Sequence, residues 1–245
     1  MFGKNPVRKA TTGSGSILDV VEIFPTIQGE GPYAGRPAHF IRLFGCPLRC
    51  HFCDTDFESR MEPMSVDRIV EQIRTNEKIG PFNADLIVIT GGEPMRQQLG
   101  PLVGRLLTEQ FTVQIETAGI LFPASLRDWI GHPALTLVCS PKTAEIDPEV
   151  AAICKDYKYI VRDQGAVDPE DGLPMSSTQI PGKICRIYRP EAGLARIYLQ
   201  PCEEYHPDGT PDDEGTRANV EAAAFASMQF NYTLSLQLHK LIGLP

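Results

Sequence analysis

Three cysteines, Cys46, Cys50 and Cys53, crowd into eight residues with the sequence CPLRCHFC. Three thiolates at this spacing can bind three irons of a cubane [4Fe–4S] cluster from one loop, which leaves the fourth iron open to another ligand. A structural zinc site would need a fourth protein ligand, and His51 or a distant cysteine is available for that role. Since no second Cys-x-x-Cys pair is present, the spacing favours one iron–sulfur cluster over zinc.

The other four cysteines are scattered, with at least fourteen residues between neighbours: Cys139, Cys154, Cys185 and Cys202. Wide spacing and apolar neighbours favour buried thiols over an auxiliary cluster. An odd total of seven cysteines, with no apolar export segment near the N-terminus, argues against a disulfide framework. We therefore expect reduced thiols and a cytoplasmic protein.

Other polar groups follow or interrupt apolar runs. Arg42 lies in an otherwise apolar segment, where a buried charge needs an anionic partner, either a ligand or an internal carboxylate. Gln28, Gly29 and Glu30 combine a permissive backbone with an amide and a carboxylate, which suits a guanine-like edge or a plain turn. Lys142 follows another apolar run, at the strand end where a barrel builds its site, and a surface lysine is the alternative to a site residue.

Alternating strands and helices are expected to position these groups. Strands are predicted over 17–24, 38–44, 86–90, 111–117, 135–139, 157–161, 195–200 and 233–238, and helices from Ser65, over 99–107, from Asp147 and over 217–230. This order predicts an α/β fold with largely parallel strands and right-handed crossovers. Because no GxGxxG opens the first unit, we predict a partial (abridged) β/α barrel, with the chemistry at the carboxyl ends of the strands.

Length and composition limit the other possibilities. The 245 residues, 42% of them hydrophobic, predict a single catalytic domain over 17–245 behind a flexible tail over 1–16. No apolar run reaches the ~18–20 residues of a membrane helix. A net charge of −8 disfavours a nucleic-acid partner, including an RNA-modification role. The polar segments 163–178 and 203–215 are predicted to be solvated loops.

Together these motifs resemble a known family. The cysteine segment resembles the signature of the radical S-adenosylmethionine (SAM) superfamily, and GGEP at 91–94 resembles its GGE motif. The closer resemblance is to the 7-carboxy-7-deazaguanine synthase family and extends over residues 17–245. It is carried, in order, by PTIQGEG (25–31), FIRL (40–43), GC (45–46), CDT (53–55), TGGEP (90–94), ETAG (116–119), SPK (140–142), QP (200–201) and QLHK (237–240).

The resemblance implies an activity: conversion of 6-carboxy-5,6,7,8-tetrahydropterin to 7-carboxy-7-deazaguanine, with loss of ammonia, on the route to queuosine-type 7-deazapurines. It also implies a carbon–nitrogen lyase with one [4Fe–4S] cluster, SAM and Mg²⁺, a homodimeric state and an external electron donor such as flavodoxin. In that mechanism an adenosyl radical takes hydrogen from C6 of the pterin, and the ring then contracts. A glycyl-radical activating enzyme is one alternative, but it does not explain Gln28–Gly31, Arg42 or the Gln237–Lys240 segment. A zinc-stabilised binding module is the other, and iron and sulfide after anaerobic reconstitution would exclude it.

The resemblance further implies roles for individual residues. Cys46, Cys50 and Cys53 would bind the cluster, and Thr55 would bind magnesium. The residues implied for SAM are Phe52, Asp54, Gly92, Glu93, Glu116, Ser140, Pro141, Lys142, Gln200, Pro201, Cys202 and Glu203. Those implied for the substrate are Ile27, Gln28, Gly29, Glu30, Arg42, Thr90 and Pro245. The terminal carboxylate of Pro245 would lie over the barrel mouth, although an apolar tail packed in the core or at a dimer contact is an equal alternative.

Overall fold

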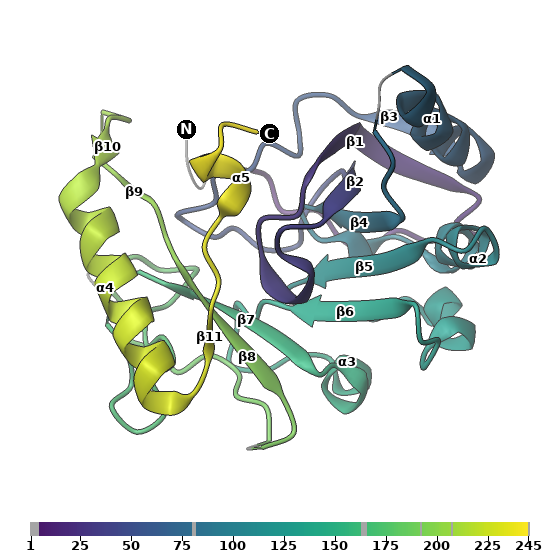
Figure 1. Cartoon of the computed structure of the whole chain (residues 1–245). Helices are drawn as coiled ribbons and strands as arrows, with labels where there is room; N and C mark the ends of the chain where they lie inside the picture. The colour runs from purple at the N-terminus through teal and green to yellow at the C-terminus, as the bar shows by residue number, and fades with distance from the viewer. Residues whose placement is uncertain (1–4, 80–81, 163–165, 192, 207, 245) are drawn as a thin grey trace.

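The computed structural model describes residues 5–79, 82–162, 166–191, 193–206 and 208–244 (Figure 1). These residues form one nine-stranded sheet in the order β11-β8-β7-β6-β5-β4-β2-β1-β3, beside a two-stranded ribbon, β9–β10. The pairings from β2 through β4, β5, β6, β7 and β8 to β11 are all parallel, whereas β1 is antiparallel to both β2 and β3. The predicted class, a largely parallel partial β/α barrel, is confirmed.

The strands within the described residues are β1 Ile17–Ile27, β2 Pro37–Leu43, β3 Glu62–Ser65, β4 Leu86–Gly91, β5 Thr112–Thr117, β6 Leu135–Cys139, β7 Asp156–Val161, β8 Arg196–Pro201, β9 Glu204–Tyr205, β10 Pro211–Asp212 and β11 Thr233–Leu234. The helices are α1 Val66–Ile79, α2 Gly100–Thr108, α3 Pro148–Ile153, α4 Asp213–Phe230 and α5 Leu238–Leu241, with 3-10 turns at Gly31–Tyr33, Pro94–Arg96 and Ala124–Trp129.

Each parallel strand sends alternate side chains to opposite faces of the sheet. In β4, Ile87 and Ile89 join the main hydrophobic core, whereas Leu86 and Val88 form a smaller cluster on the inner face. The core also takes side chains from α1, α2, α3 and α4, so these helices cover the outer face. The inner face of the sheet lines a cavity. Thr90, two residues after Val88 and on the same face of β4, is part of that lining.

The two edges of the parallel run are bridged by the turn after β1 and the segment after β11 (Figure 1). The Gly31 N–H donates to Ser235 Oγ (3.0 Å), and the Leu238 N–H donates to the Gly29 carbonyl (3.3 Å). A Cβ at Gly29 would collide with the His239 ring, so only glycine permits this approach. The C-terminal segment therefore closes the open side of the barrel.

Several predicted boundaries were wrong. The strand predicted over 233–238 ends at Leu234, because the chain then turns inward to the β1–β2 turn and forms α5. Helix α4 begins at Asp213, within a predicted loop, because the Asp212 carboxylate caps it by accepting from the Gly215 N–H (2.9 Å). Strand β3 was missed, and the predicted loop over 163–178 is folded where described, with an antiparallel bridge between Val167 and Pro174.

The N-terminal segment also differs from the flexible tail that was expected. Residues 1–4 lie outside the described residues, but Val7 forms a bridge with Cys46, and the Arg8 N–H donates to the Cys46 carbonyl (2.7 Å). The Thr11 N–H donates to the Arg96 carbonyl (2.7 Å). Residues 5–11 therefore lie along the cysteine segment. No helix in the described part of the chain has the length and apolar character needed to cross a membrane.

Candidate active site

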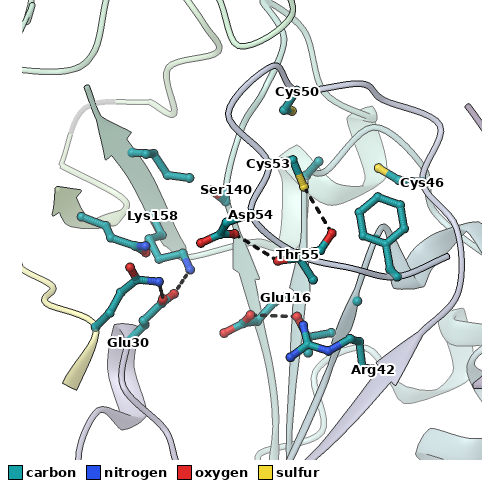
Figure 2. Close-up of a pocket in the computed structure, with 18 of the residues that line it drawn as sticks. Glu30, Arg42, Cys46, Cys50, Cys53, Asp54, Thr55, Glu116, Ser140 and Lys158 are labelled. Atoms are coloured by element: carbon teal, nitrogen blue, oxygen red, sulfur yellow. Dashed lines mark hydrogen bonds and ion pairs between the residues drawn. The ribbon is translucent and has the colours of Figure 1, made fainter. Parts of the chain in front are cut away.

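A cavity of about 590 Å³ opens at the carboxyl ends of the parallel strands. Its lining includes all three clustered cysteines, the inward side chains of the strands, and α5. Figure 2 shows Cys46, Cys50 and Cys53 on one side, and Glu30, Lys158, Glu116 and Arg42 across the cavity from them. This is where a β/α barrel places its chemistry.

The cysteine loop follows β2 and is held close to the end of β4. Gly45 has a φ of 81°, a value that favours glycine, and its carbonyl accepts from the Glu93 N–H (3.0 Å). A Cβ at Gly92 would collide with that same carbonyl, and one at Gly91 would collide with the Leu43 carbonyl. The resemblance implied a SAM contact for Gly92, and the structure shows that both glycines let the cysteine loop contact β4.

The three thiols are partly or fully buried around the cavity. Burial raises the pKa of Cys46 to about 12 and also raises the pKa of Cys53. Iron would therefore have to displace thiol protons on binding. The Leu48 N–H donates to Cys46 Sγ (3.4 Å), and the Gln179 side-chain amide donates to Cys50 Sγ (3.2 Å). Donors of this kind suit sulfur atoms that become ligating thiolates.

Across the cavity, Glu30 and Lys158 form an ion pair in which each side chain is 10% exposed. Burial opposes the charge on Glu30, but the Lys158 ammonium and the Gln237 amide lower its pKa below the ordinary value. Burial likewise opposes the charge on Lys158, but Glu30 and Glu116 raise its pKa. Both groups are thus charged, and each compensates the other's burial.

Glu116 lies at the same level of the barrel and accepts three hydrogen bonds. The donors are Gln28 Nε2 (3.1 Å), Gln114 Nε2 (3.0 Å) and Thr90 Oγ1 (3.0 Å). The resemblance implied a SAM contact for Glu116, but its carboxylate groups with Gln28 and Thr90, which were implied for the substrate. The inner floor is therefore a connected set of amide and carboxylate groups.

Arg42 points into the cavity from β2 and has a protein partner. Its Nε donates to Glu22 Oε1 (2.6 Å) from the neighbouring strand, and its guanidinium lies over the Phe24 ring (5.5 Å to the centroid). The internal ion pair considered from the sequence is thus present. Glu22 is half exposed and Arg42 is only 21% exposed, so the guanidinium remains at the cavity wall.

Residues at the cavity mouth come from the cysteine loop, from the segment after β8 and from helix α5. Thr55 Oγ1 donates to Asp54 Oδ1 (3.2 Å), and Lys240 from α5 bridges Asp54 (3.2 Å) and Glu203 (2.9 Å). These contacts tie the C-terminal helix to the cysteine loop and to the end of β8.

The SAM-implied residues on the strands also reach the cavity. Lys142 Nζ donates to Ser140 Oγ (2.5 Å), and burial lowers the pKa of Lys142. Phe52 lines the wall beneath the Arg162 guanidinium, 4.8 Å from its ring centroid. Cys202 lies beside Gln200, whose buried Oε1 has no hydrogen-bond partner among the described residues. An unpaired buried acceptor in a cavity wall fits a ligand that donates to it.

Some implied site residues lie outside the cavity lining. Glu93 is fully buried, and its carboxylate is used by Met95 N–H (2.9 Å), Thr117 Oγ1 (2.7 Å) and Ala118 N–H (2.7 Å). It therefore joins β4 to β5 instead of facing the cavity, and burial raises its pKa. The others outside the lining are Ile27, Gly29, Pro141 and Pro201. Pro245 lies outside the described residues, although Leu244 reaches the cavity.

Sequence reasoning missed Lys158, His239 and Lys240 as cavity residues. Lys158 carried a usable signal, because a lysine within the apolar strand DYKYIV needs a partner for the same reason as Arg42. His239 and Lys240 carried none beyond the family motif, since they reach the cavity only through the inward turn after β11.

The four scattered cysteines behave differently from one another. Cys139 and Cys154 are buried beside each other, and burial raises the pKa of Cys139 well above its ordinary value. Cys185 and Cys202 are only half buried, which corrects the prediction of four buried thiols. No group of three His, Cys, Asp or Glu side chains in the described ranges is gathered closely enough to hold a single metal ion.

Comparison with known proteins identifies the family. The family model described as the radical SAM superfamily matches residues 40–163. The 7-carboxy-7-deazaguanine synthase of Rhodospirillum rubrum is 42% identical over 244 residues, covering 99% of both chains. That of Rickettsia prowazekii is 34% identical and covers 100% of this chain and 96% of its own.

A solved structure extends the comparison to the fold. The crystal structure of QueE from Escherichia coli matches with a TM-score of 0.64 and 24% identity, over 90% of this chain and 94% of that one. At that identity the match supports the architecture alone. The identity to two named relatives across their whole length leads to the family: this chain belongs to the 7-carboxy-7-deazaguanine synthases of the radical SAM superfamily.

Proposed function

We propose that this chain converts 6-carboxy-5,6,7,8-tetrahydropterin to 7-carboxy-7-deazaguanine, with loss of ammonia. The observation that carries the proposal is one cavity with three thiols on one side and paired carboxylate, amide and cationic groups on the other. The thiols suit a cluster, and the opposite groups suit a flat heterocycle that bears a carboxylate. The relatives' name, 7-carboxy-7-deazaguanine synthase, describes a product of this kind, a flat heterocycle with a carboxylate.

Cys46, Cys50 and Cys53 would hold one [4Fe–4S] cluster, and SAM would bind beside it. When bound, the cluster and SAM would supply the radical chemistry that removes hydrogen from C6 of the pterin. The protein's part is to hold SAM between the cluster and the substrate. Ser140, Lys142 and Gln200 line the cavity on the SAM side, and the unpaired Gln200 Oε1 accepts from the cofactor.

The substrate occupies the inner floor. Glu30 and Glu116 are acceptors for the amino and ring N–H groups of the pterin, and Gln28 offers both a donor and an acceptor. Arg42 and Lys158 supply the positive charge for the substrate carboxylate, with Arg42 able to bind it through two parallel N–H groups. The Glu30–Lys158 ion pair keeps both residues charged and ordered before the substrate arrives.

Thr55 binds magnesium together with substrate oxygens. Magnesium keeps several waters and needs few protein ligands, and Thr55 lies with Asp54 at the cavity mouth. Thr55→Ala is expected to reduce turnover several-fold, and added magnesium should restore part of it. Ser59→Ala, an exposed hydroxyl on the same loop, is the control. A Thr55→Ala enzyme with wild-type turnover at limiting magnesium would remove Thr55 from the metal site.

We also propose a homodimer that works in the cytosol with an external one-electron donor such as flavodoxin. Seven free thiols suit a reducing compartment. Amino-acid side chains do not supply low-potential electrons, so an external donor would reduce the cluster.

The test is anaerobic turnover of the reconstituted protein with the carboxy-tetrahydropterin, SAM and dithionite. Mass spectrometry should detect 7-carboxy-7-deazaguanine and ammonia in equal amounts. A protein with about four irons per chain that cleaves SAM but leaves the pterin unchanged would overturn the substrate assignment. Release of zinc with no iron or sulfide would instead support the binding module considered from the sequence.

A further inference from the structure

The loop over residues 176–185 is folded against the cysteine loop, although its first three residues belong to the segment 163–178 that was predicted to be solvated. Ser176 forms an antiparallel bridge with Ile184, and the Ser177 N–H donates to the Lys183 carbonyl (2.8 Å). Ser177 Oγ accepts from the Ile180 N–H (3.1 Å). Ser177 and Thr178 are both buried. This loop is therefore an ordered element, and its own hydrogen bonds fix the side that faces the cysteine loop.

That face contacts the backbone on both sides of Cys50. The Arg49 N–H donates to Gln179 Oε1 (3.0 Å), and the His51 N–H donates to the Thr178 carbonyl (3.0 Å). Thr178 Oγ1 donates in turn to the Lys142 carbonyl (2.7 Å), which anchors the loop to the end of β6. Cys50 is held by a segment more than a hundred residues away in the chain.

Gln179 also contacts the sulfur itself. Its Nε2 donates to Cys50 Sγ (3.2 Å) and lies 2.8 Å from Thr178 Oγ1. Among the described residues, Cys50 is the one clustered cysteine whose sulfur accepts from a side-chain N–H, since Cys46 Sγ accepts from the backbone of its own loop. The Gln179 amide thus holds the cysteine loop through its oxygen and contacts the Cys50 thiol through its nitrogen.

We propose that Gln179 is a positioning residue for the iron–sulfur cluster, and that its N–H···S hydrogen bond raises the cluster's reduction potential. The inference rests on the proposed function, in which Cys50 is a cluster ligand. A donor to a ligating sulfur stabilises negative charge, and the reduced cluster carries one more negative charge than the oxidised one. Gln179 therefore favours the reduced state that SAM cleavage needs.

Two variants separate the two parts of the amide. Gln179→Leu removes the acceptor and the donor, whereas Gln179→Glu keeps an acceptor for the Arg49 N–H and replaces the donor with a carboxylate beside the sulfur. Gln229→Leu, on the exposed side of α4, is the matched control. Circular dichroism and thermal melting verify that each variant folds.

Three measurements are compared with the wild type. In the metal-free protein, hydrogen exchange of the Arg49 amide should accelerate in Gln179→Leu and stay slow in Gln179→Glu. In the reconstituted protein, iron release to a chelator should be about 10-fold faster in Gln179→Leu. The midpoint potential, from a redox titration followed by electron paramagnetic resonance, should be more negative in Gln179→Leu and more negative again in Gln179→Glu. Gln229→Leu should match the wild type throughout.

An unchanged midpoint potential in a folded Gln179→Leu or Gln179→Glu protein would overturn the proposal, because a merely structural residue would alter stability without shifting the potential. If Gln179→Leu does not fold, the potential of Gln179→Glu decides. Failure of the proposed function has a different signature: the wild type itself would take up no iron or leave SAM intact.

Discussion

The two sides of the cavity are built by different means. On the strand side, Thr90, Glu116 and Lys158 point inward because the alternation of parallel strands leaves no other direction. On the cysteine side, the three thiols sit on a loop held by segments remote in sequence, among them residues 5–11 and 177–179. The strand side is preorganised by the core, and the cysteine side depends on contacts that can be removed one at a time.

The ion pairs on the two sides of the cavity also differ in how deeply they are buried. On the strand side the Glu30–Lys158 pair is buried and its members compensate each other. On the cysteine side the ion pairs, such as Arg8–Glu58, are more exposed, and the order comes from backbone hydrogen bonds. Damage to the strand side should therefore lower the stability of the whole protein, whereas damage to the cysteine side should lower cluster retention.

The largest expected effect is loss of the cluster itself. Cys46→Ala, Cys50→Ala or Cys53→Ala should each abolish turnover and most iron binding, because a [4Fe–4S] cluster left with two protein thiolates is not retained. Iron and sulfide analysis after anaerobic reconstitution measures this. Cys185→Ala, a half-buried thiol outside the cavity, is the control and should retain full iron. A comparable loss of iron in Cys185→Ala would contradict the single-cluster account.

The next effect is on stability, from Glu30→Gln. This change leaves the Lys158 ammonium buried without its partner and should cost about 3–5 kcal/mol in the free energy of unfolding. Asp85→Asn breaks an exposed pair with Arg36 and should cost less than about 1 kcal/mol. Urea unfolding of the metal-free proteins measures both, and equal costs would contradict the claim that the buried pair stabilises the strand side.

The Glu30–Lys158 pair also predicts how the free energy of unfolding depends on pH. The lowered pKa of Glu30 means that its contribution is present above its unfolded pKa and is lost as pH falls through the folded value. The raised pKa of Lys158 means that its contribution is present below its unfolded pKa and is lost as pH rises through the folded value. The contribution of the Glu30–Lys158 pair to the stability of the wild type should thus be flat between about pH 5 and pH 10 and shrink on either side, as urea unfolding of the wild type over that pH range measures.

A smaller effect is expected from deleting residues 5–11 on the cysteine side. The deletion removes the backbone bond to Cys46 and the bond from Asn5 Nδ2 to the Thr55 carbonyl (3.2 Å). Iron release to a chelator should accelerate by up to about 10-fold, with little change in unfolding free energy. Arg8→Ala keeps the backbone bonds and should release iron nearly at the wild-type rate. A deletion that destabilises the fold as much as Glu30→Gln would break the comparison.

The smallest effect is expected from Arg42→Lys. The charge stays, but an ammonium cannot reproduce the two parallel N–H groups of guanidinium, so KM for the pterin should rise several-fold with kcat less affected. Glu22→Gln keeps Arg42 and removes its carboxylate partner, so KM should stay the same or fall. An unchanged KM for Arg42→Lys would count against a substrate contact.

The difference between the two sides also explains what the sequence could predict. Apolar runs such as LIVIT located the parallel strands to within a few residues, and the three cysteines identified themselves by spacing. The inward turn after β11 was not predictable, because it depends on Gly31 meeting Ser235 and Gly29 meeting His239 across the barrel. The burial of Glu93 could not be predicted from the sequence either, since two of its hydrogen-bond donors come from the end of β5. Local periodicity carries no information about such long-range pairings.

The most direct test of the central claim, that the pterin reacts in this cavity beside the cluster, is deuterium transfer from substrate labelled at C6. The account predicts deuterium at the 5′ carbon of the recovered S-adenosylmethionine or 5′-deoxyadenosine in the wild type, and none in Cys50→Ala. Formation of 7-carboxy-7-deazaguanine with no deuterium in the adenosyl group would contradict it.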